Sequence, residues 1–281
     1  MKQFDINAFM PLIKVWGQYK SPWVPEGEEL EIFKKFLRRA LKKQHHKRVL
    51  ILGSTPQLRD LAHDLGAEVT VVDVSLNMMM GLPYLMKNKK LVDRETWVRS
   101  GWLDAPLQHN HWNVVLGDWV ICNIPKNLQT TFTAKIKDIL VPGGLFITKA
   151  YFVLEKKIST NQIINNFLGK PRPSFRDYQD YFTELMYART DKRTWSHSVN
   201  DLRFVLKQFY KTFRDHKLKL KIKKHLEMLD YMLGKGDFVW ACPTEKDGEK
   251  IFTKYFIIKG KQYSTEHSFG QNNPIYLFQK K

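Results

Sequence analysis

Cysteine is scarce in this sequence of 281 residues, which contains only Cys122 and Cys242. Two thiols are too few for a disulfide framework or for a multi-cysteine zinc site. Histidines without partners at metal-ligand spacing include His45, His46, His197 and His225. The sequence therefore predicts two ordinary buried thiols and no metal site.

Long apolar runs are also missing. Nowhere do about 18 consecutive apolar residues occur without a charge, so the sequence predicts no membrane-spanning helix. The first residues, MKQFDINAFMPLIKVWGQYK, lack the apolar core and the small-residue cleavage site of a signal peptide. These absences predict a cytoplasmic protein.

Acidic residues are few compared with basic ones, 28 against 46, and the formal net charge is +18. An excess of positive charge suits a polyanion such as RNA, because each neutralised phosphate releases counterions. The excess consists largely of lysine, without Gly-Arg runs or a basic tail, and so it fits a bias in composition equally well. The positive charge is therefore compatible with RNA as a partner but does not identify RNA as the partner.

Strands and helices alternate in the first half of the chain. Residues 1–48 form an N-terminal arm and an amphipathic helix, and the apolar runs RVLILG and EVTVVDVS then flank a helical segment. Further apolar runs begin at Trp112 and after the turn VPGG, and their continuous apolar character is typical of parallel strands covered on both faces. Residues 49–154 are therefore predicted to be a Rossmann-like, doubly wound, mostly parallel sheet of the α/β class, with seven strands once the tail is included.

The alternation stops after Tyr151. Residues 155–236 have helical patterns and contain 18 Lys and Arg against 9 Asp and Glu, which predicts a basic helical insertion, or lid. Residues 237–281 then return to the core, with a helix opened by a capping box from Thr244 to Asp247 and two closing strands. Those strands are expected to form an antiparallel hairpin at the sheet edge.

Two residues of the first strand–helix–strand unit suit an adenosine cofactor. Gly53 ends the first strand, where a missing Cβ permits close approach, and Asp73 ends the second, at the separation expected for an acid that binds ribose hydroxyls. The turn between them has no second or third glycine and no GK[ST], which argues against dehydrogenases and P-loop nucleotide hydrolases. A cofactor without a pyrophosphate fits this turn better.

Four segments in order, VLILGSTPQLRDLAHDLGAEVTVVDVS, SGWLDAPL, WNVVLGDWVICNIP and LVPGGLFIT, resemble the motifs of class I S-adenosylmethionine-dependent methyltransferases. SPWVPEGEE at residues 21–29 resembles the lead-in of some bacterial small-molecule members. The sequence departs from the family's GxGxG, which is reduced here to Gly53 alone, and Gly101 stands where an adenine-binding acid is common.

The resemblance implies a role for each matched residue. Gly53, Ser54 and Thr55 would face the methionine and ribose of the cofactor, and Asp73 would bind the ribose hydroxyls. Val74, Met78, Trp102 and Leu103 would line the adenine. Gly117, Asp118 and Trp119 would lie beside the sulfonium. Asp118 is the nearest candidate acid or base, and a structural role or a contact with the cofactor amine is the favoured alternative. Apart from the resemblance, Tyr19 and Trp23 precede the first long helix. They either fold over the cofactor, where an aromatic face favours a cation, or pack as ordinary residues of the N-terminal arm.

The leading hypothesis is methyl transfer from S-adenosylmethionine to a small-molecule acceptor enclosed by the helical lid, yielding S-adenosylhomocysteine. Candidate residues for the acceptor pocket are Tyr178, Tyr181, Phe182, Tyr187 and Trp195. One alternative is an RNA methyltransferase whose basic lid follows phosphates, and another is a cofactor-binding protein without catalysis. The acceptor, the methylated atom and the oligomeric state are not indicated by the sequence.

Overall fold

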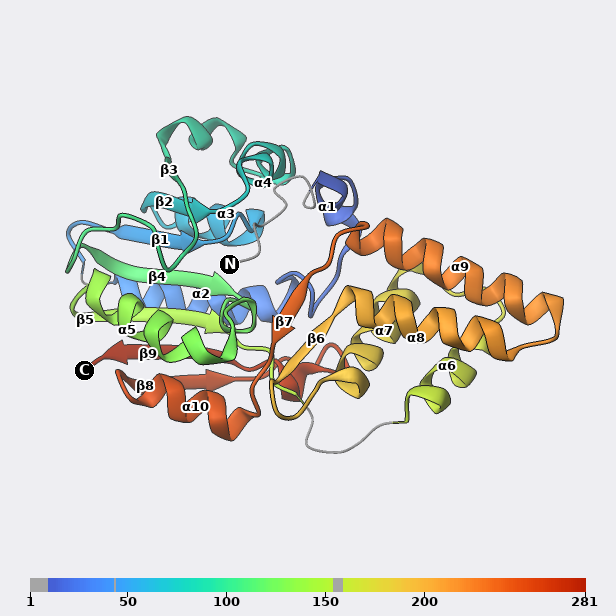
Figure 1. Cartoon of the computed structure of the whole chain (residues 1–281). Coiled ribbons are helices and arrows are strands. Elements are labelled where there is room, and N and C mark those ends of the chain that lie inside the picture. Colours follow the sequence, from blue (N-terminus) through green and yellow to red (C-terminus); the bar gives the residue numbers. More distant parts are fainter. Residues whose placement is uncertain (1–9, 43, 154–158) are drawn as a thin grey trace. The chain divides into compact units, whose positions relative to one another are not determined.

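The computed structural model of the chain describes residues 10–42, 44–153 and 159–281 (Figure 1). The described residues divide into two compact units. The core unit contains residues 20–152 and 243–281, and the helical unit contains the residues up to Tyr19 and those from Val153 to Cys242.

The core unit is built on a seven-stranded sheet. In spatial order its strands are β3 (Thr96–Arg99), β2 (Glu68–Asp73), β1 (Arg48–Leu52), β4 (Trp112–Asp118), β5 (Leu140–Lys149), β9 (Ile275–Lys280) and β8 (Phe256–Gln262). Neighbouring strands from β3 to β5 are parallel, whereas β9 is antiparallel to both β5 and β8. This arrangement confirms the predicted α/β class, the mostly parallel seven-stranded sheet and its C-terminal antiparallel hairpin.

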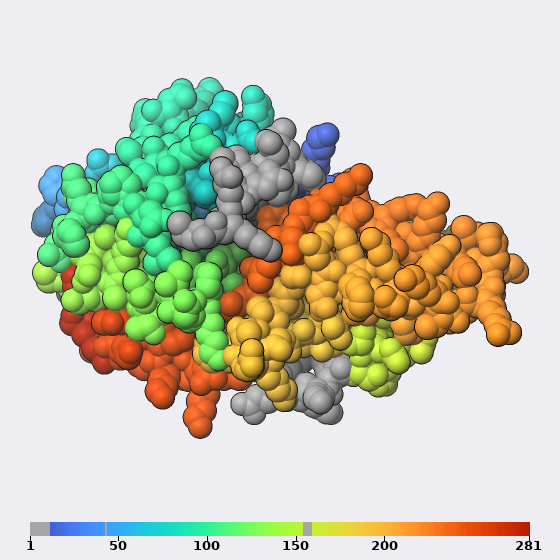
Figure 2. Space-filling model, in the orientation of Figure 1, coloured from blue at the N-terminus to red at the C-terminus, as the bar shows by residue number. Residues whose placement is uncertain are grey.

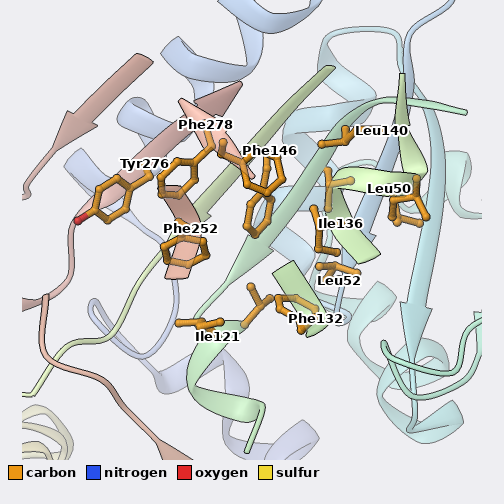
Figure 3. Packing of buried hydrophobic residues seen from close by; sticks show 14 of the residues in the cluster. Leu50, Leu52, Ile121, Phe132, Ile136, Leu140, Phe146, Phe252, Tyr276 and Phe278 are labelled. Carbon is orange, nitrogen blue, oxygen red and sulfur yellow. The ribbon is translucent and has the colours of Figure 1, made fainter. Parts of the chain in front are cut away.

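Helices cover both faces of this sheet (Figure 1). Val49 and Ile51 of β1 pack toward α2 (Gly27–Leu41) and α3 (Pro56–Asp64). Leu50 and Leu52 pack on the opposite face, toward α5 (Gln129–Ile139), in the same apolar cluster as residues of α10 (Glu245–Thr253). Figure 3 shows that second cluster, with Phe132, Ile136, Phe146, Phe252 and Phe278 among its members. Burial on both faces explains why the strands read as continuous apolar runs.

Shorter helices complete the core unit. They are α4 (Leu76–Gly81) and the 3-10 turns at Leu82–Leu85, Lys89–Arg94, Ile121–Asn123, Lys126–Leu128 and Gly270–Asn272. Helix α10 begins where the capping pattern predicts, since the Asp247 backbone N–H donates to the Thr244 side chain at 3.2 Å.

The helical unit has its own apolar core. Its elements are α1 (Met10–Val15), a 3-10 turn (Trp16–Gln18), α6 (Thr160–Leu168), α7 (Phe175–Arg189), β6 (Ser196–Ser198), α8 (Val199–Thr212), α9 (His216–Leu233) and β7 (Val239–Ala241). Ile164, Phe182, Leu202 and Leu229 are fully buried in it. Residues 155–236 are mainly helical where they are described, but the antiparallel pair β6–β7 was not anticipated, because three-residue strands have no readable periodicity.

In the described part of the chain, no helix has both the length and the apolar character needed to cross a membrane. The cytoplasmic location stays a prediction.

Candidate active site

The carboxyl ends of four adjacent strands bring one row of residues together. Register pairs Leu52 of β1 with Val72 of β2 and with Gly117 of β4. Asp118 in turn pairs with Lys149 of β5. Across the sheet the row is Asp73, Gly53, Asp118 and Lys149. Strands lie about 4.8 Å apart, so the row spans about 14 Å at the edge where open α/β sheets bind ligands.

Gly53 forms the turn between β1 and α3. Its φ of 89° lies in the region that L side chains rarely adopt, and its backbone N–H donates to the Val72 carbonyl at 2.9 Å. A Cβ at this position would have one described neighbour within 4 Å, a ring carbon of Trp102 at 3.7 Å. Thr55 then stands at the N-cap of α3. Gly53 is partly exposed, whereas Ser54 and Thr55 are buried.

Asp73 is held in one orientation by two donors. Its Oδ2 accepts from the Ser54 hydroxyl at 2.7 Å, and its Oδ1 accepts from the Ser75 backbone N–H at 2.8 Å. Burial raises the pKa of Asp73, although Ser75 and Ser54 oppose that rise by hydrogen bonding to the carboxylate. Ser54 and Asp73, both predicted site residues, are therefore brought into direct contact.

The residues expected around the adenine follow the ends of β2 and β3. Met78 is buried on α4, and Val74 is half-buried just beyond β2. The Trp102 indole N–H donates to the Val72 carbonyl at 2.9 Å, which fixes the segment after β3 against the end of β2. Leu103 packs beside it on the apolar cluster of the α5 face.

The end of β4 makes a tight turn. A Cβ on Gly117 would lie 2.4 Å from Cγ1 of Val120, so no larger residue fits there without a shift. Trp119 has a φ of 53°, its indole N–H donates to Asn273 at 2.8 Å, and its ring stacks on Tyr151 at 4.6 Å between centroids. Trp119 is thus fixed beside the row by contacts on both its polar and aromatic parts.

A buried ion cluster lies at the same edge and was missed by the sequence analysis. Lys149 Nζ is 2.7 Å from Glu29 on α2, 3.3 Å from Asp118 and 2.7 Å from the Pro22 carbonyl. Glu29 also accepts from the Ser21 hydroxyl at 2.9 Å, and its other oxygen lies 3.0 Å from His267 Nε2. A lysine that closes the apolar run LFIT is the only sequence signal for this cluster.

Charge states in the cluster depend on burial and on its close partners. Burial raises the pKa of Asp118 to about 7, with Lys149 lowering it and Glu29 raising it further. Burial alone would lower the pKa of Lys149, but the two carboxylates raise it above its usual range. For Glu29 burial is likewise outweighed, and Lys149 and His267 hold the pKa of its carboxyl below the usual range.

The two aromatic residues of the N-terminal arm fall in different units. Tyr19 belongs to the helical unit, where its hydroxyl donates to the Met232 carbonyl and its ring lies 5.9 Å from that of Phe175. Trp23 belongs to the core unit and its backbone N–H donates to Lys20 at 2.9 Å. Their assignment to the cofactor stays a prediction.

Most aromatics proposed for an acceptor pocket are buried inside the helical unit. Tyr178, Tyr181 and Phe182 are at most 2% exposed, and both tyrosine rings pack around His225. Burial lowers the pKa of His225 to about 4, and Lys221 and Lys224 add to this effect. These side chains stabilise the unit's interior. Both cysteines are buried, and the described residues contain no cluster of three or more His, Cys, Asp or Glu that could hold a metal ion.

Comparison with known proteins places the fold. No protein-family model and no curated protein matches the sequence. Among solved structures, a Rhodobacter sphaeroides protein assigned to the Zn-dependent alcohol dehydrogenases covers 100% of both chains, with a TM-score of 0.62 and 15% identity. The PH0226 protein from Pyrococcus horikoshii OT3 covers 95% of this chain and 98% of its own, with a TM-score of 0.53 and 12% identity.

A third structure is the Burkholderia thailandensis 1,6-didemethyltoxoflavin-N1-methyltransferase, solved with bound 1,6-didemethyltoxoflavin and S-adenosylhomocysteine. It covers 96% of this chain and 85% of its own, with a TM-score of 0.52 and 12% identity. The chain has the fold of class I methyltransferases. At these identities the likeness concerns the fold, and the activity has to be argued from the site.

Proposed function

We propose that this chain transfers a methyl group from S-adenosylmethionine to a small-molecule acceptor and releases S-adenosylhomocysteine. The observation that carries the proposal is the row at the sheet edge, where an oriented acid, Asp73, stands one strand away from the open turn at Gly53. The likeness to a methyltransferase that was solved with a small-molecule acceptor supports the same class of acceptor.

The residues of the row suit this cofactor. A carboxylate offers about four lone-pair positions, and the Ser54 hydroxyl and the Ser75 N–H occupy two of those on Asp73, so the carboxylate can also accept from ribose hydroxyls. Gly53, Ser54 and Thr55 offer backbone to the ribose and methionine parts. Apolar groups for an adenine ring are Val74, Met78, Trp102 and Leu103.

Methyl transfer is an in-line displacement for which the bound cofactor supplies an activated methyl group. The chain's own residues align the partners and exclude water from the edge. Gly117, Asp118 and Trp119 are assigned to the methyl end, because they close the strand next to Gly53. A helical lid over the acceptor remains part of the proposal.

Calorimetry tests the first step of this proposal. We expect S-adenosylmethionine to bind the wild type and to bind Asp73→Asn roughly 10–100-fold more weakly, because a hydrogen bond to a charged group contributes about 1.5–3 kcal/mol. The matched control is Asp138→Asn, whose carboxylate pairs with Lys137 and is 46% exposed in the same unit. Failure of the wild type to bind would refute the proposed function.

Transfer itself is tested with labelled cofactor, incubated with a metabolite extract or with total RNA. Label entering small molecules supports the proposal, and label entering RNA alone overturns the acceptor class. Binding without transfer to either pool would favour a cofactor-binding protein without catalysis.

One observation favours RNA as the second candidate partner. Helices α8 and α9 lie side by side in the helical unit (Figure 1), and their side chains form a contiguous surface in Figure 2. A hollow of about 510 Å³ between them is lined by Phe204, Lys207, Gln208, Tyr210, Lys211, Lys223 and Leu226. Aromatic faces beside lysines, with no acid among the lining residues, suit stacked bases and phosphates of a single strand.

Fluorescence anisotropy with a labelled single-stranded oligouridylate tests this surface. We expect binding that weakens steeply with salt and is lost in the triple variant Lys207→Gln, Lys211→Gln, Lys223→Gln. The matched control neutralises Lys89, Lys90 and Lys250, which are exposed on the core unit. Equal losses in both triple variants would point to net charge alone and would remove the specific site.

A further inference from the structure

We propose that Asp118, held by Lys149 and Glu29, matches the positive charge of the methyl donor, so that the site distinguishes the donor from its uncharged product. This inference rests on the proposed function. It assigns a selectivity role to a cluster of buried charges that the fold places at the carboxyl edge.

The three charged side chains meet on one face of the sheet. Leu116 of β4 and Ile147 of β5 belong to the apolar cluster beneath α2 and α3. Because side chains alternate along a strand, Asp118 and Lys149, each two residues further on, point to that same face. Glu29 reaches them from α2. The cluster therefore sits between α2 and the ends of β4 and β5.

The position of Asp118 in the row fits the dimensions of the donor. Asp118 is next to Gly53 across the sheet, and Asp73 lies one strand beyond, about 10 Å from Asp118 at ordinary strand spacing. A donor whose ribose is held by Asp73 and whose methionine crosses Gly53 brings its sulfonium toward Asp118. No comparable cation is present in the product.

The charges of the cluster balance in a way that favours a cation. The charged groups facing Asp118 are Lys149 of β5 and Glu29 of α2, and His267, from the segment between β8 and β9, joins through Glu29. The charges of Lys149 and Glu29 cancel, so Asp118 adds one net negative charge when it is ionised and none when it is protonated. The ionised state is therefore the complement of a sulfonium.

Both charge states of Asp118 are accessible near neutral pH, because burial raises the pKa of its carboxyl group to about 7. A cation placed nearby lowers the pKa of a carboxyl group. Donor binding near pH 7 should therefore release a proton from Asp118 to solvent. Affinity for the donor should increase as pH rises through this range, while affinity for the product should not. The site would then retain the donor and release the product.

Calorimetry with S-adenosylmethionine and S-adenosylhomocysteine, at pH 6 and pH 8, tests the inference. In the wild type we expect the ratio of donor to product affinity to rise by up to about tenfold, the effect of one pKa unit. In Asp118→Asn the ratio should stay constant, and in the surface control Asp138→Asn it should behave as in the wild type. Buffers of different ionisation enthalpy should reveal proton release with the donor and less with the product.

The α-amino group that both ligands carry also titrates near pH 8, so the decisive quantity is the difference between the wild type and Asp118→Asn. A ratio with the same pH dependence in both proteins would overturn the inference. If neither ligand binds the wild type, the proposed function fails instead. If Asp118→Asn does not fold, Glu29→Gln provides an independent test. Loss of the Glu29 carboxylate should move the pH midpoint, at which the ratio of donor to product affinity rises, to a lower value. An unchanged midpoint would contradict the inference.

Discussion

Glu29 at the start of α2 and Lys149 at the end of β5 are 120 residues apart in sequence, yet their side chains form an ion pair of 2.7 Å with no exposed surface. The pair joins the helix that precedes the sheet to β5, an inner strand that lies between β4 and β9. Desolvating two charges is costly, so the pair is weak evidence for net stabilisation, but the loss of one partner alone should lower stability.

Removing one partner of this pair should destabilise the core unit. We expect Lys149→Met to lower the free energy of unfolding by about 3–5 kcal/mol, because it leaves the Glu29 charge buried and less well compensated. The double variant Lys149→Met, Glu29→Gln should recover part of this loss in urea unfolding. In the exposed pair of Lys20 and Glu26, Lys20→Met should cost about 0–1 kcal/mol. Equal losses from both lysine variants would contradict the assigned difference in burial.

A second stability prediction concerns Gly248 in α10. Alanine normally stabilises a helix relative to glycine, but here the new Cβ would lie 2.3 Å from a ring carbon of Phe152. We expect Gly248→Ala to destabilise the core unit by about 1–3 kcal/mol through overpacking. Thermal unfolding checks this, with Lys250→Ala on the exposed side of the same helix changing little. A raised melting temperature for Gly248→Ala would show that the Phe152 ring can move away from the new methyl group without loss of stability.

Much of the core fold could be predicted from local pattern. Apolar runs covered on both faces identified the strands at Val49, Val69 and Trp112, and the amphipathic helix predicted within residues 1–48 spans Gly27–Leu41. The grouping of the chain's first described residues with the helical unit could not be predicted. It depends on contacts such as that of Tyr19 with Met232, which link distant segments.

The candidate site also contains residues that could be predicted from the sequence and residues that could not. Asp73 and Gly53 could be predicted from the sequence, because their positions at strand ends and their spacing are local properties. The contact of Ser54 with Asp73 follows from the tight turn. Glu29 could not be recognised, because an acid in the first turn of a helix is ordinary. Its role arises only when the sheet brings Lys149 to it.

The pH dependence of stability should reflect a second buried cluster, that of Glu95. Its carboxylate pairs with the guanidinium of Arg59 and with His63, and the Trp97 indole N–H donates to it at 2.7 Å. Burial raises the pKa of Glu95, but these partners outweigh burial and hold it below the usual range. Its stabilising contribution is therefore present above the unfolded-state pKa of about 4.3 and is lost as pH falls through the lower folded value.

Glu95→Gln should accordingly lower the melting temperature at pH 7, where Arg59 loses its charged partner, and the difference from the wild type should shrink below about pH 4. Thermal unfolding at pH 7, 5 and 3 measures this. Glu31→Gln removes an acid that is 68% exposed and should behave as the wild type throughout. A difference for Glu95→Gln that stays constant with pH would mean that the carboxylate charge is not the stabilising element.

Ligand binding at the Gly53 turn should be visible in the fluorescence of Trp102. Its ring is the described neighbour closest to the open side of Gly53, and its indole N–H is held by the Val72 carbonyl at 2.9 Å. We expect S-adenosylhomocysteine to change the emission of the wild type and most of that change to disappear in Trp102→Phe. The affinity of this variant should fall about 2–10-fold, because Phe cannot donate to Val72. Trp97→Phe, in the neighbouring strand β3, should keep the signal, since its indole contacts Glu95. A signal that survives Trp102→Phe but is lost in Trp97→Phe would place the ligand away from the Gly53 turn.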